Sequence, residues 1–557
     1  MAPSLTDIAL GEQVIAAWTR VWGLRQLAPF TNALLGIAGG AIDNWPLQGP
    51  LSWWHWHVRL PTVLISMVWP SPLLAFSAHA CNLAFLAATM PFVWDHMMWA
   101  SLHDVAFVAA MLTGCFAASP WGFLAGARAQ TIISYLCSAF WKLTTSFLDP
   151  RYSCGTLLVA ELLSILPGSL FPPHGLATGI MLRAAPLITI VTEFAIPVLL
   201  AFCPHAGVLL GIFFHLTIFI LPVNAAGGFS ITCATSYFFF VPQGMVLAWE
   251  NLSNSMVCTG VAGAVTAIAF AGLRGTGDVT FAIYLTFATL LVYAIFLERR
   301  NPALEMAPRA MGWKFQLFAV SLAVCHGLLG PILGLQNMGS LTMYGNVKHW
   351  GGSNHLLVPT GLLLDVFADV RAETPLFGAF AGGIVRVDTS DLPADLLRSP
   401  ADATNLLPAH VRNLMKGVGN PGIFYAPYYA RMASSDFFED VDSGMDWSVQ
   451  PFAVPAFELR RLLALARARG EPFMLRYTRL PREARTPGQW MRHKGPQVLV
   501  QEDPREGTAR CIIDGDGPCA ADELAVLPPP PRWLTASLLP YPIPLLDVNG
   551  TEIPCVS

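Results

Sequence analysis

The stretch SAFWKLTTSFLDP, residues 138–150, places one lysine inside an apolar run that otherwise has the composition of a membrane span. An ammonium group at mid-bilayer costs about 2.5–3.5 kcal/mol on insertion scales, so such a group reaches the surface or has a task. Lys142 lies about two turns before Asp149, and its stem could simply reach the nearer interface. A dry pocket would instead disfavour the charged amine, and a neutral amine is a general base. The residues alone leave both alternatives open.

The composition of the whole chain also indicates a membrane protein. Of its 557 residues, 54% are hydrophobic and 12% are charged, whereas a soluble domain is typically about 25% charged. The net charge of −4 provides no basic field for nucleic acid, which excludes that partner. Charged residues are rare between residues 60 and 335 and common after residue 360. We expect an N-terminal interfacial segment (1–57), a transmembrane domain (58–340) and a C-terminal α+β domain (341–557).

Apolar runs of about 20 residues follow one another through the expected transmembrane domain. They predict about nine spans, and therefore an all-α polytopic membrane bundle followed by the α+β domain. The first run is one long span or two helices broken at Pro70, and the run 156–170 is short enough to be re-entrant or interfacial. The runs lie at 61–90, 102–124, 129–148, 156–170, 184–203, 206–222, 229–248, 255–272, 279–297 and 315–335.

The two ends of the chain have their own patterns. The N-terminal segment contains LTDIALGEQVIAAWTRVWGLRQL (5–27), whose apolar positions recur at helical spacing, and leads into the tryptophan-rich SWWHWHVRLP (52–61). These patterns predict an interfacial segment or an amphipathic helix packed on the bundle. In the C-terminal domain, DVFADVRAETPLFGAFAGGIVRVDTSD (365–391) predicts short strands and turns. FELRRLLALARARG (457–470) predicts an amphipathic helix, whereas EPFMLRYTRL (471–480) and QVLVQED (497–503) alternate as strands do.

Charges and cysteines set the expected topology. The positive-inside rule makes the loop LERRNPALEMAPRAMGWK cytosolic, because it collects Arg299, Arg300, Arg309 and Lys314. The last span then places the C-terminal domain in a lumen, in the endoplasmic reticulum or another endomembrane, or outside the cell. On that side CIIDGDGPC (511–519) can close a disulfide loop, and the sequon at Asn549 is accessible, whereas the sequon at Asn251 is cytosolic. The cysteines of the apolar region, Cys154 among them, are expected to pack as small hydrophobes.

Ionisable residues in or beside the spans are candidate site residues, because polar groups are costly in a membrane. His215 lies mid-span in GIFFHLTIFILP, as a satisfied core residue or as a catalyst. His96, in WDHMMW at a span entrance, fits an aromatic belt or the mouth of a site. Glu193 is about 15 Å from Arg183 on one helix, so it has another partner or stays protonated. The full set is His96, His103, Asp104, Lys142, Glu161, Arg183, Glu193, His215 and His326.

Several membrane chemistries lack their motifs in this chain. There are no clustered histidine boxes as in di-iron enzymes, and the pair His55-Trp-His57 cannot complete a metal site, so no metal is expected. A nucleotide is not supported, because neither GxxxxGK[ST] nor GxGxxG after a strand occurs. Any reaction that this chain catalyses is therefore expected to use acid–base side chains and a diffusible cofactor.

Three stretches in this order, FWKLTTSFLDP (140–150), TEFAIPVLLAF (192–202) and GVLLGIFFHLTIFILP (207–222), carry a family resemblance. They resemble the vitamin K-dependent γ-carboxylase and its wider horizontally transferred transmembrane (HTTM) family. The Lys-Leu, acidic and Phe-His elements of that family fall on Lys142-Leu143, Glu193 and Phe214-His215. VWDHMMWASLHD resembles the family's entry segment and places its histidine at His96.

The resemblance implies an enzyme that couples oxygenation of a reduced vitamin K-like quinone to carboxylation of glutamyl residues in a protein or peptide. O₂ and CO₂ would be co-substrates, and membrane lipid would surround the enzyme. Lys142 would deprotonate the hydroquinone, His96 would act at the carboxylation step, and His215 would lie beside the quinone, with Glu193 and Phe214 in its binding site. The alternative is a protein of the same fold without catalysis, either a lipid- or quinone-binding partner or a transporter.

Overall fold

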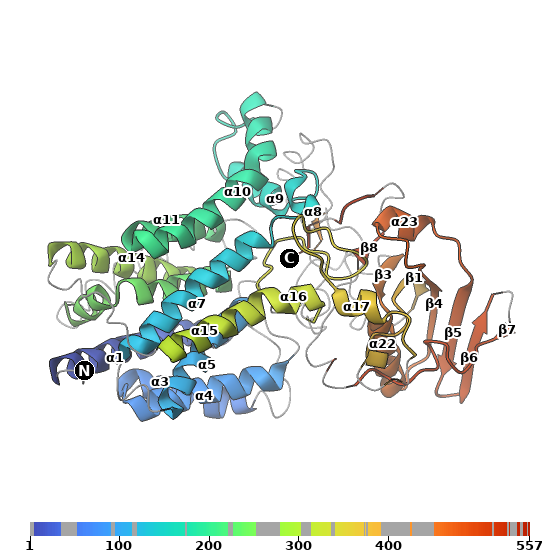
Figure 1. Cartoon of the computed structure of the whole chain (residues 1–557), viewed down its shortest axis with the longest axis horizontal. Coiled ribbons are helices and arrows are strands. Elements are labelled where there is room, and N and C mark those ends of the chain that lie inside the picture. The colour runs from blue at the N-terminus through green and yellow to red at the C-terminus, as the bar shows by residue number, and fades with distance from the viewer. Residues whose placement is uncertain are drawn as a thin grey trace. The chain divides into compact units, whose positions relative to one another are not determined.

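The computed structural model divides the chain into two compact units (Figure 1). Unit 1 consists of Met1–Thr89, Val93–Cys137 and Val191–His326, and unit 2 of Met90–Phe92, Ser138–Ile190 and Gly327–Ser557. The structure describes residues 5–34, 53–90, 95–113, 120–172, 175–220, 227–251, 279–301, 313–335, 340–371, 374, 377–391, 424–425, 451–514, 517–531, 534, 543–545, 550–553 and 555–556.

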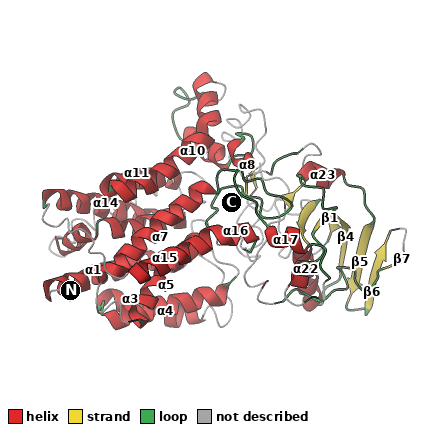
Figure 2. Cartoon of the chain, viewed as in Figure 1, coloured by secondary structure: helices red, strands yellow, loops and turns green. Residues whose placement is uncertain are grey.

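Unit 1 is helical throughout the residues that the structure describes (Figure 2). Helix α7 begins in unit 1 and ends in unit 2, whereas helix α10 begins in unit 2 and ends in unit 1. The helices are α1 (Leu5–Leu34), η1 (His55–Arg59), α3 (Leu60–Val68), α4 (Pro72–Thr89), α5 (Asp95–Leu112), α7 (Pro120–Phe140), α10 (Leu176–Phe202), α11 (Pro204–Phe219), α12 (Gly227–Ser236), η2 (Tyr237–Phe240), α14 (Val279–Arg300) and α15 (Trp313–Val324).

The N-terminal helix α1 is part of the interior of unit 1. Trp18 and Trp22 are 2% and 1% exposed, so of the two expected alternatives the structure shows the helix packed on the bundle. The first apolar run is two helices, because α3 ends at Val68 and α4 begins at Pro72, with Pro70 between them. Proline lacks the N–H that would continue the helix, which explains the break.

Three helices of the described residues are long and apolar enough to cross a membrane: Leu176–Phe202, Phe281–Arg300 and Trp313–Leu333. A fourth is added if Gly228–Phe240 and Pro242–Asn251, which are bent by 102° against each other, form one span. The nine spans expected from the sequence are therefore not supported. Several apolar runs form helices shorter than the ~20 residues that a bilayer requires, namely Pro72–Ala88, Cys154–Leu163 and Pro204–Phe219. The run 255–272 lies outside the described residues.

Unit 2 contains a seven-stranded antiparallel sheet in the order β7-β6-β5-β4-β1-β3-β8 (Figure 1). A second, parallel pair joins β2 to β9. The strands are β1 (Ile384–Ser390), β2 (Phe424–Tyr425), β3 (Phe452–Pro455), β4 (Phe473–Arg479), β5 (Gln497–Asp503), β6 (Thr508–Ile513), β7 (Gly517–Pro518), β8 (Ile543–Pro544) and β9 (Cys555–Val556). The helices are α8 (Thr145–Leu148), α9 (Cys154–Ser164), η4 (Cys325–Leu329, which begins in unit 1), α16 (Gly330–Leu333), α17 (Leu362–Phe367), η5 (Phe377–Phe380), α22 (Ala456–Arg469) and α23 (Pro487–Arg492).

The sheet buries one face against α22, as the sequence patterns predict. Leu475 and Tyr477 on β4 alternate inward and meet Leu459 and Leu462 of the helix in one apolar core. Burying each such side chain contributes about 1.5–3 kcal/mol. The expected strands at 471–480 and 497–503 and the helix at 457–470 are confirmed, whereas 365–391 contains helical turns besides its one strand, β1.

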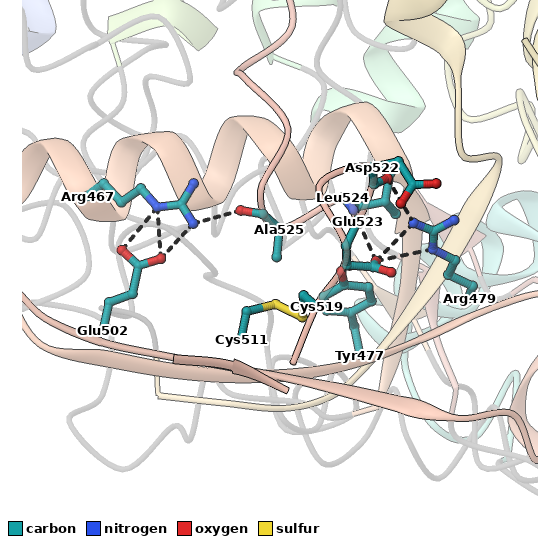
Figure 3. The surroundings of a disulfide bond; sticks show 10 residues. All are labelled: Arg467, Tyr477, Arg479, Glu502, Cys511, Cys519, Asp522, Glu523, Leu524 and Ala525. Atoms are coloured by element: carbon teal, nitrogen blue, oxygen red, sulfur yellow. Dashed lines mark hydrogen bonds and ion pairs between the residues drawn. A yellow bond between two sulfur atoms is a disulfide. The ribbon is translucent and has the colours of Figure 1, made fainter. Parts of the chain in front are cut away.

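The expected disulfide Cys511–Cys519 is also confirmed, and it joins β6 to the residue after β7 (Figure 3). In the same view Arg467 of α22 donates to the Glu502 carboxylate of β5 at 2.6 Å, and Tyr477 donates to Glu523 at 2.5 Å. These contacts attach the helix and the 520–527 turns to the sheet. The disulfide holds the outer hairpin formed by β6 and β7.

Candidate functional site

Lys142 follows the end of α7 and belongs to unit 2, where it is only 2% exposed. Its Nζ donates to the Met343 carbonyl at 2.7 Å, to the Ser138 hydroxyl at 3.2 Å and to the Ser138 carbonyl at 3.4 Å. The same atom lies 6.0 Å from the centre of the Phe147 ring, at the outer limit of a cation–π contact. A lysine that reaches the interface keeps its head group in water. Lys142 does not, so the structure shows the buried alternative.

The segment that accepts from Lys142 has an unusual backbone. Tyr344 and Asn346 both have φ of 54°, a left-handed conformation that side chains other than glycine rarely adopt. Gly345, between them, approaches the turn after α7 so closely that a Cβ would lie 2.7 Å from the Trp141 carbonyl oxygen. A residue held in such a conformation costs about 1–3 kcal/mol, and such residues cluster at functional sites. The strain therefore marks the surroundings of Lys142 as a candidate site.

A second set of hydrogen bonds holds the Lys142 loop against residues 345–355. Thr144 Oγ1 donates to the Gly345 carbonyl at 3.0 Å, and the Thr145 amide donates to the Asn354 carbonyl at 3.0 Å. The ring Nε2 of His355 lies 2.9 Å from the Phe140 carbonyl oxygen. Because these partners are mainly backbone groups, side-chain patterns in the sequence do not reveal them. They fix the loop on both sides of Lys142.

The C-terminal residues complete the support of this loop. Glu552 Oε2 accepts from the Thr145 hydroxyl at 2.9 Å and from the Ser146 hydroxyl at 2.6 Å. Cys154 forms a disulfide with Cys555 across a sequence separation of 401 residues. The expectation that Cys154 packs as a free thiol is therefore wrong. Its partner lies near the far end of the chain, and spacing in the sequence gives no indication of such a pair.

Lys348 is a second buried lysine of unit 2, and the sequence analysis missed it. It is 7% exposed, its Nζ donates to the Arg485 carbonyl, and it lies 5.2 Å from the centre of the Trp490 ring. Burial lowers the pKa of this amine to about 8, against the opposing effect of Glu552 and with a smaller lowering by Arg485. In the sequence, Lys348 is recognisable only as a lysine between two aromatic residues, Tyr344 and Trp350, in the segment that follows the last apolar run.

In unit 1 the structure brings two of the predicted histidines to one helix, α12. His96 on α5 is 5% exposed and lies so close to Gly228 that a Cβ there would be 2.6 Å from the ring Nε2. His215 on α11 is fully buried, with its ring 5.0 Å from that of Phe229 and 5.3 Å from that of Phe214. Gly228 and Phe229 are neighbours in sequence. The two histidines therefore contact adjacent positions of α12.

Two tyrosines that the sequence analysis missed complete this cluster. Tyr135 Oη lies 2.6 Å from His215 Nε2 and also forms a hydrogen bond with Tyr237 Oη. Glu193 on α10 is buried, with 6% of the residue exposed. Tyrosines are ordinary in aromatic belts, so only their contact with a buried histidine distinguishes them. We name the set His96, Tyr135, Glu193, Phe214, His215 and Tyr237 the histidine cluster.

The remaining ionisable residues have other surroundings. Asp104 is fully buried and accepts from Trp22 Nε1 at 3.0 Å, from His79 Nδ1 at 2.7 Å and from Asn82 Nδ2 at 2.7 Å. It therefore ties α1, α4 and α5 together. His103 Nε2 lies 3.2 Å from the Thr131 hydroxyl. Glu161 is buried on α9, His326 is half-buried in η4, and Arg183 is exposed on α10.

The two groups of predicted residues belong to different units. Lys142 lies in unit 2, whereas the histidine cluster lies in unit 1. That Lys142 and His215 act on the same quinone, as the family resemblance implies, stays a prediction. Among the residues that the structure describes, no three His, Cys, Asp or Glu side chains are grouped as metal ligands.

Comparison with known proteins gives one match. A family model described as a domain of unknown function, DUF8388, matches residues 353–536, which include the strands from β1 to β7 and α22. Neither the curated proteins nor the solved structures give a match. The matched part is less than half of the chain and leaves out Lys142, the histidine cluster and the Cys154–Cys555 disulfide.

Proposed function

We propose that the chain is an integral membrane enzyme in which Lys142 takes a proton from a reduced quinone, so that oxygenation of the quinone drives carboxylation of glutamyl residues. The observation that carries this proposal is the burial of Lys142 beside two strained non-glycine residues, Tyr344 and Asn346. Burying a lysine and straining the backbone both cost free energy that an apolar side chain in a relaxed loop would avoid. A catalytic role for the Lys142 amine would explain why the protein tolerates both the buried lysine and the strained backbone.

The histidine cluster contains hydrogen-bonding side chains of the kind that the two hydroxyl groups of a reduced quinone would use. A quinol presents two hydroxyl groups on an aromatic ring, and the cluster offers Tyr135, Tyr237 and His215 as hydrogen-bonding groups beside aromatic rings. When bound, the reduced quinone would react with O₂ and supply the strong base that precedes CO₂ addition. Phe214 would stack near its ring, with Glu193 at the edge of the site. His96 would hold or deliver a proton at the carboxylation step.

The surroundings of both groups of residues suit a strong base. His215 is fully buried and Lys142 nearly so, which excludes bulk water from each. Water would quench such a base before it reached a glutamyl carbon. The helices that are long and apolar enough to cross a membrane support a multi-pass protein. The proposal assigns it to the endoplasmic reticulum or another endomembrane. The proposed substrate is a protein or peptide, and membrane lipid would surround the enzyme.

A second candidate function is quinone or lipid binding without catalysis. The observation that favours it is the hydrogen bonding of Lys142, whose Nζ already lies within reach of three oxygen atoms of its own unit. An ammonium group has three donors, and such a set satisfies a structural lysine. The two candidates differ in whether Lys142 is needed for turnover.

The test is hydroquinone epoxidation by purified protein in lipid. We expect epoxide formation by the parent protein, and a loss of about 10²–10⁴-fold in Lys142→Ala, the usual contribution of a general base. Lys314→Ala, which changes an exposed lysine, is the matched control and should keep full activity. Added methylamine should restore part of the Lys142→Ala activity, with a pH profile set by the added amine.

Each other outcome has a defined meaning. Activity that survives Lys142→Ala rejects Lys142 as the base. A parent protein that binds hydroquinone, measured by quenching of tryptophan fluorescence, but forms no epoxide supports the second candidate. Loss without rescue by methylamine assigns Lys142 a structural role, which a shift in the thermal unfolding of the variant would show independently.

A further inference from the structure

We propose that residues 356–359 of unit 2, which we call the apolar turn, lie in the edge of the lipid bilayer, where their side chains contact lipid instead of water. The proposal gives a lipid-binding surface to a segment that does not itself cross a membrane. It requires only that the helix Trp313–Leu333, which is long and apolar enough, crosses one. It does not depend on the proposed catalysis.

The apolar turn is exposed although its side chains are those of a buried segment. Leu356 and Leu357 are 53% and 66% exposed. The stretch 349–364 around them contains no Asp, Glu, Lys or Arg, in a part of the chain where charged residues are otherwise common. Among the described residues after 340, the other exposed large hydrophobic side chains are Val366 and Val526. Adjacent exposed apolar side chains of this kind mark an interaction surface.

The backbone donors of the apolar turn are satisfied without water. The Leu356 amide donates to the Leu143 carbonyl at 2.9 Å. The next two amides of the turn both donate to His355 Nδ1, each at 3.2 Å. The fourth residue, Pro359, has no amide hydrogen. A segment in contact with lipid must satisfy its backbone groups within the protein, because hydrocarbon offers no hydrogen bonds. The pairing of every amide in the turn therefore suits a lipid environment.

His355 accepts from both amides because its proton lies on the other ring nitrogen. Its Nε2 is 2.9 Å from the Phe140 carbonyl oxygen, which can only accept, so Nε2 carries the hydrogen and donates. Nδ1 of the neutral ring then has its lone pair directed at the amides of the apolar turn. His355 is therefore a positioning residue for the turn, and it links the turn to the end of α7.

The apolar turn is also attached to the end of a candidate span. The helix Trp313–Leu333 has 21 residues, which gives a length of about 32 Å against the ~30 Å of the hydrocarbon core, so its last residues lie near the edge of that core. Gly361, two residues after the apolar turn, donates its amide to the Pro331 carbonyl at 3.4 Å. A Cβ on Gly334 would lie 2.9 Å from the Gly361 Cα. These contacts hold the apolar turn at the depth where the helix ends.

Lipid contact at the apolar turn bears on Lys142, because the turn is paired with the Lys142 loop. Thr144 and His355 form an antiparallel bridge, next to the hydrogen bond between the Leu356 amide and the Leu143 carbonyl. The bilayer would therefore hold this loop from outside, in addition to the hydrogen bonds that hold it from within unit 2.

The test is spin labelling of single cysteines in purified full-length protein, reconstituted into phosphatidylcholine vesicles. Collisions of each label with O₂, which concentrates in hydrocarbon, and with a water-soluble nickel chelate report its surroundings. Leu357→Cys reports the apolar turn, Leu329→Cys is the lipid control on the helix Trp313–Leu333, and Glu506→Cys is the water control between β5 and β6. All three positions are exposed. The parent variant keeps both disulfides and the buried Cys137 and Cys233, and replaces Cys81, Cys115, Cys203, Cys258 and Cys325 with serine.

We expect the label at Leu357→Cys to collide more often with O₂ than with the nickel chelate, as at Leu329→Cys, and the label at Glu506→Cys to show the reverse. A preference for the nickel chelate at Leu357→Cys overturns the proposal, because the turn then faces water. A label that is shielded from both reagents also overturns it, because the turn then packs against protein. A preference for the nickel chelate at Leu329→Cys removes its premise, the crossing by Trp313–Leu333.

Variants of His355 test the role of the paired amides. His355→Ala removes the acceptor of two amides, so the label at Leu357→Cys should lose its preference for O₂ in that background. His355→Asn keeps an acceptor near the position of Nδ1 and should preserve the preference, which separates this role from a general loss of structure. An unchanged preference in His355→Ala would overturn the role assigned to His355. None of these measurements uses catalysis, so a protein without epoxidase activity could still confirm the lipid contact.

Discussion

The histidine cluster of unit 1 and the Lys142 loop of unit 2 hold their buried polar side chains in different ways. In unit 1, side chains of one helix meet side chains of other helices, as Tyr135 meets His215 and Tyr237. In unit 2, Lys142 meets a main-chain carbonyl of residue 343, and a disulfide far away in sequence supports its loop. The first arrangement depends on the identity of a few side chains. The second depends on the shape of a backbone, so the two units should respond differently to substitution.

The largest expected effect is on unit 2 and comes from Cys154→Ser. Removing a native disulfide typically costs about 2–5 kcal/mol, and the chain-entropy model predicts a larger cost for a longer loop. The two bonds of this chain close separations of 401 and 8 residues, a difference equivalent to about 3 kcal/mol in that model. Hydrogen exchange should accelerate in residues 340–355 and leave α14 of unit 1 unchanged.

Cys511→Ser is the matched control for this prediction. It should loosen only the outer hairpin, β6 and β7, and leave residues 340–355 protected. Equal acceleration of hydrogen exchange in residues 340–355 by the two substitutions would show that the Cys154–Cys555 bond does not support the Lys142 loop. The loop would then not depend on a bond between residues distant in sequence.

The next effect in size is a pH dependence of unit 2. Burial lowers the pKa of Lys348 from 10.5 to about 8. Between these values the unfolded chain binds more protons than the folded one, so stability should rise with pH by up to about 3 kcal/mol. Below pH 8 both states are protonated and the cost of burial is fully present. Thermal unfolding at pH 7.5 and pH 10 should show the rise, and Lys348→Met should abolish it.

A pH profile that is the same in Lys348→Met and in the parent protein would contradict this account. It would assign the titration to other groups, and Lys348 would then be held without a penalty from its surroundings.

The smallest predicted effect is on unit 1. Tyr135→Phe removes a hydroxyl that both His215 and Tyr237 use, and leaves two buried polar groups short of a partner, at a cost of about 1–3 kcal/mol. Tyr284→Phe is the matched control, because Tyr284 is equally buried and donates to one main-chain carbonyl, that of Ile212. Thermal unfolding should separate the two variants. Equal losses of stability in Tyr135→Phe and Tyr284→Phe would mean that the Tyr135 network stabilises unit 1 no more than one hydrogen bond to a main-chain carbonyl does.

Local patterns in the sequence were sufficient for much of unit 2. The alternation in 471–480 and 497–503 and the helical spacing of 457–470 predict β4, β5 and α22, because one buried face requires that periodicity. Proximity in sequence likewise reveals Cys511–Cys519. The Cys154–Cys555 pair has no such signal, since its ends are brought together only by the completed fold.

Composition was a poor guide to the number of spans, although it identified the apolar part of the chain. An apolar run does not determine whether its helix continues for a full bilayer thickness, and the run at 61–90 divides at Pro70. The candidate site shows the same limit. Lys142 and His215 can be selected from the sequence because they are polar residues in apolar runs. Tyr135 and the carbonyl of Met343 cannot, because only the folded structure shows that they bond to His215 and to Lys142.

The bond between Cys154 and Cys555 also imposes an order on biosynthesis. A ribosome reaches residue 555 only after adding 401 residues beyond Cys154, which takes about 20–80 s at 5–20 residues per second. During that interval Cys154 has no partner from its mature fold, while the helices of unit 1 and the strands of the sheet are already being made. The environment of the Lys142 amine is thus among the last parts of the protein to be finished.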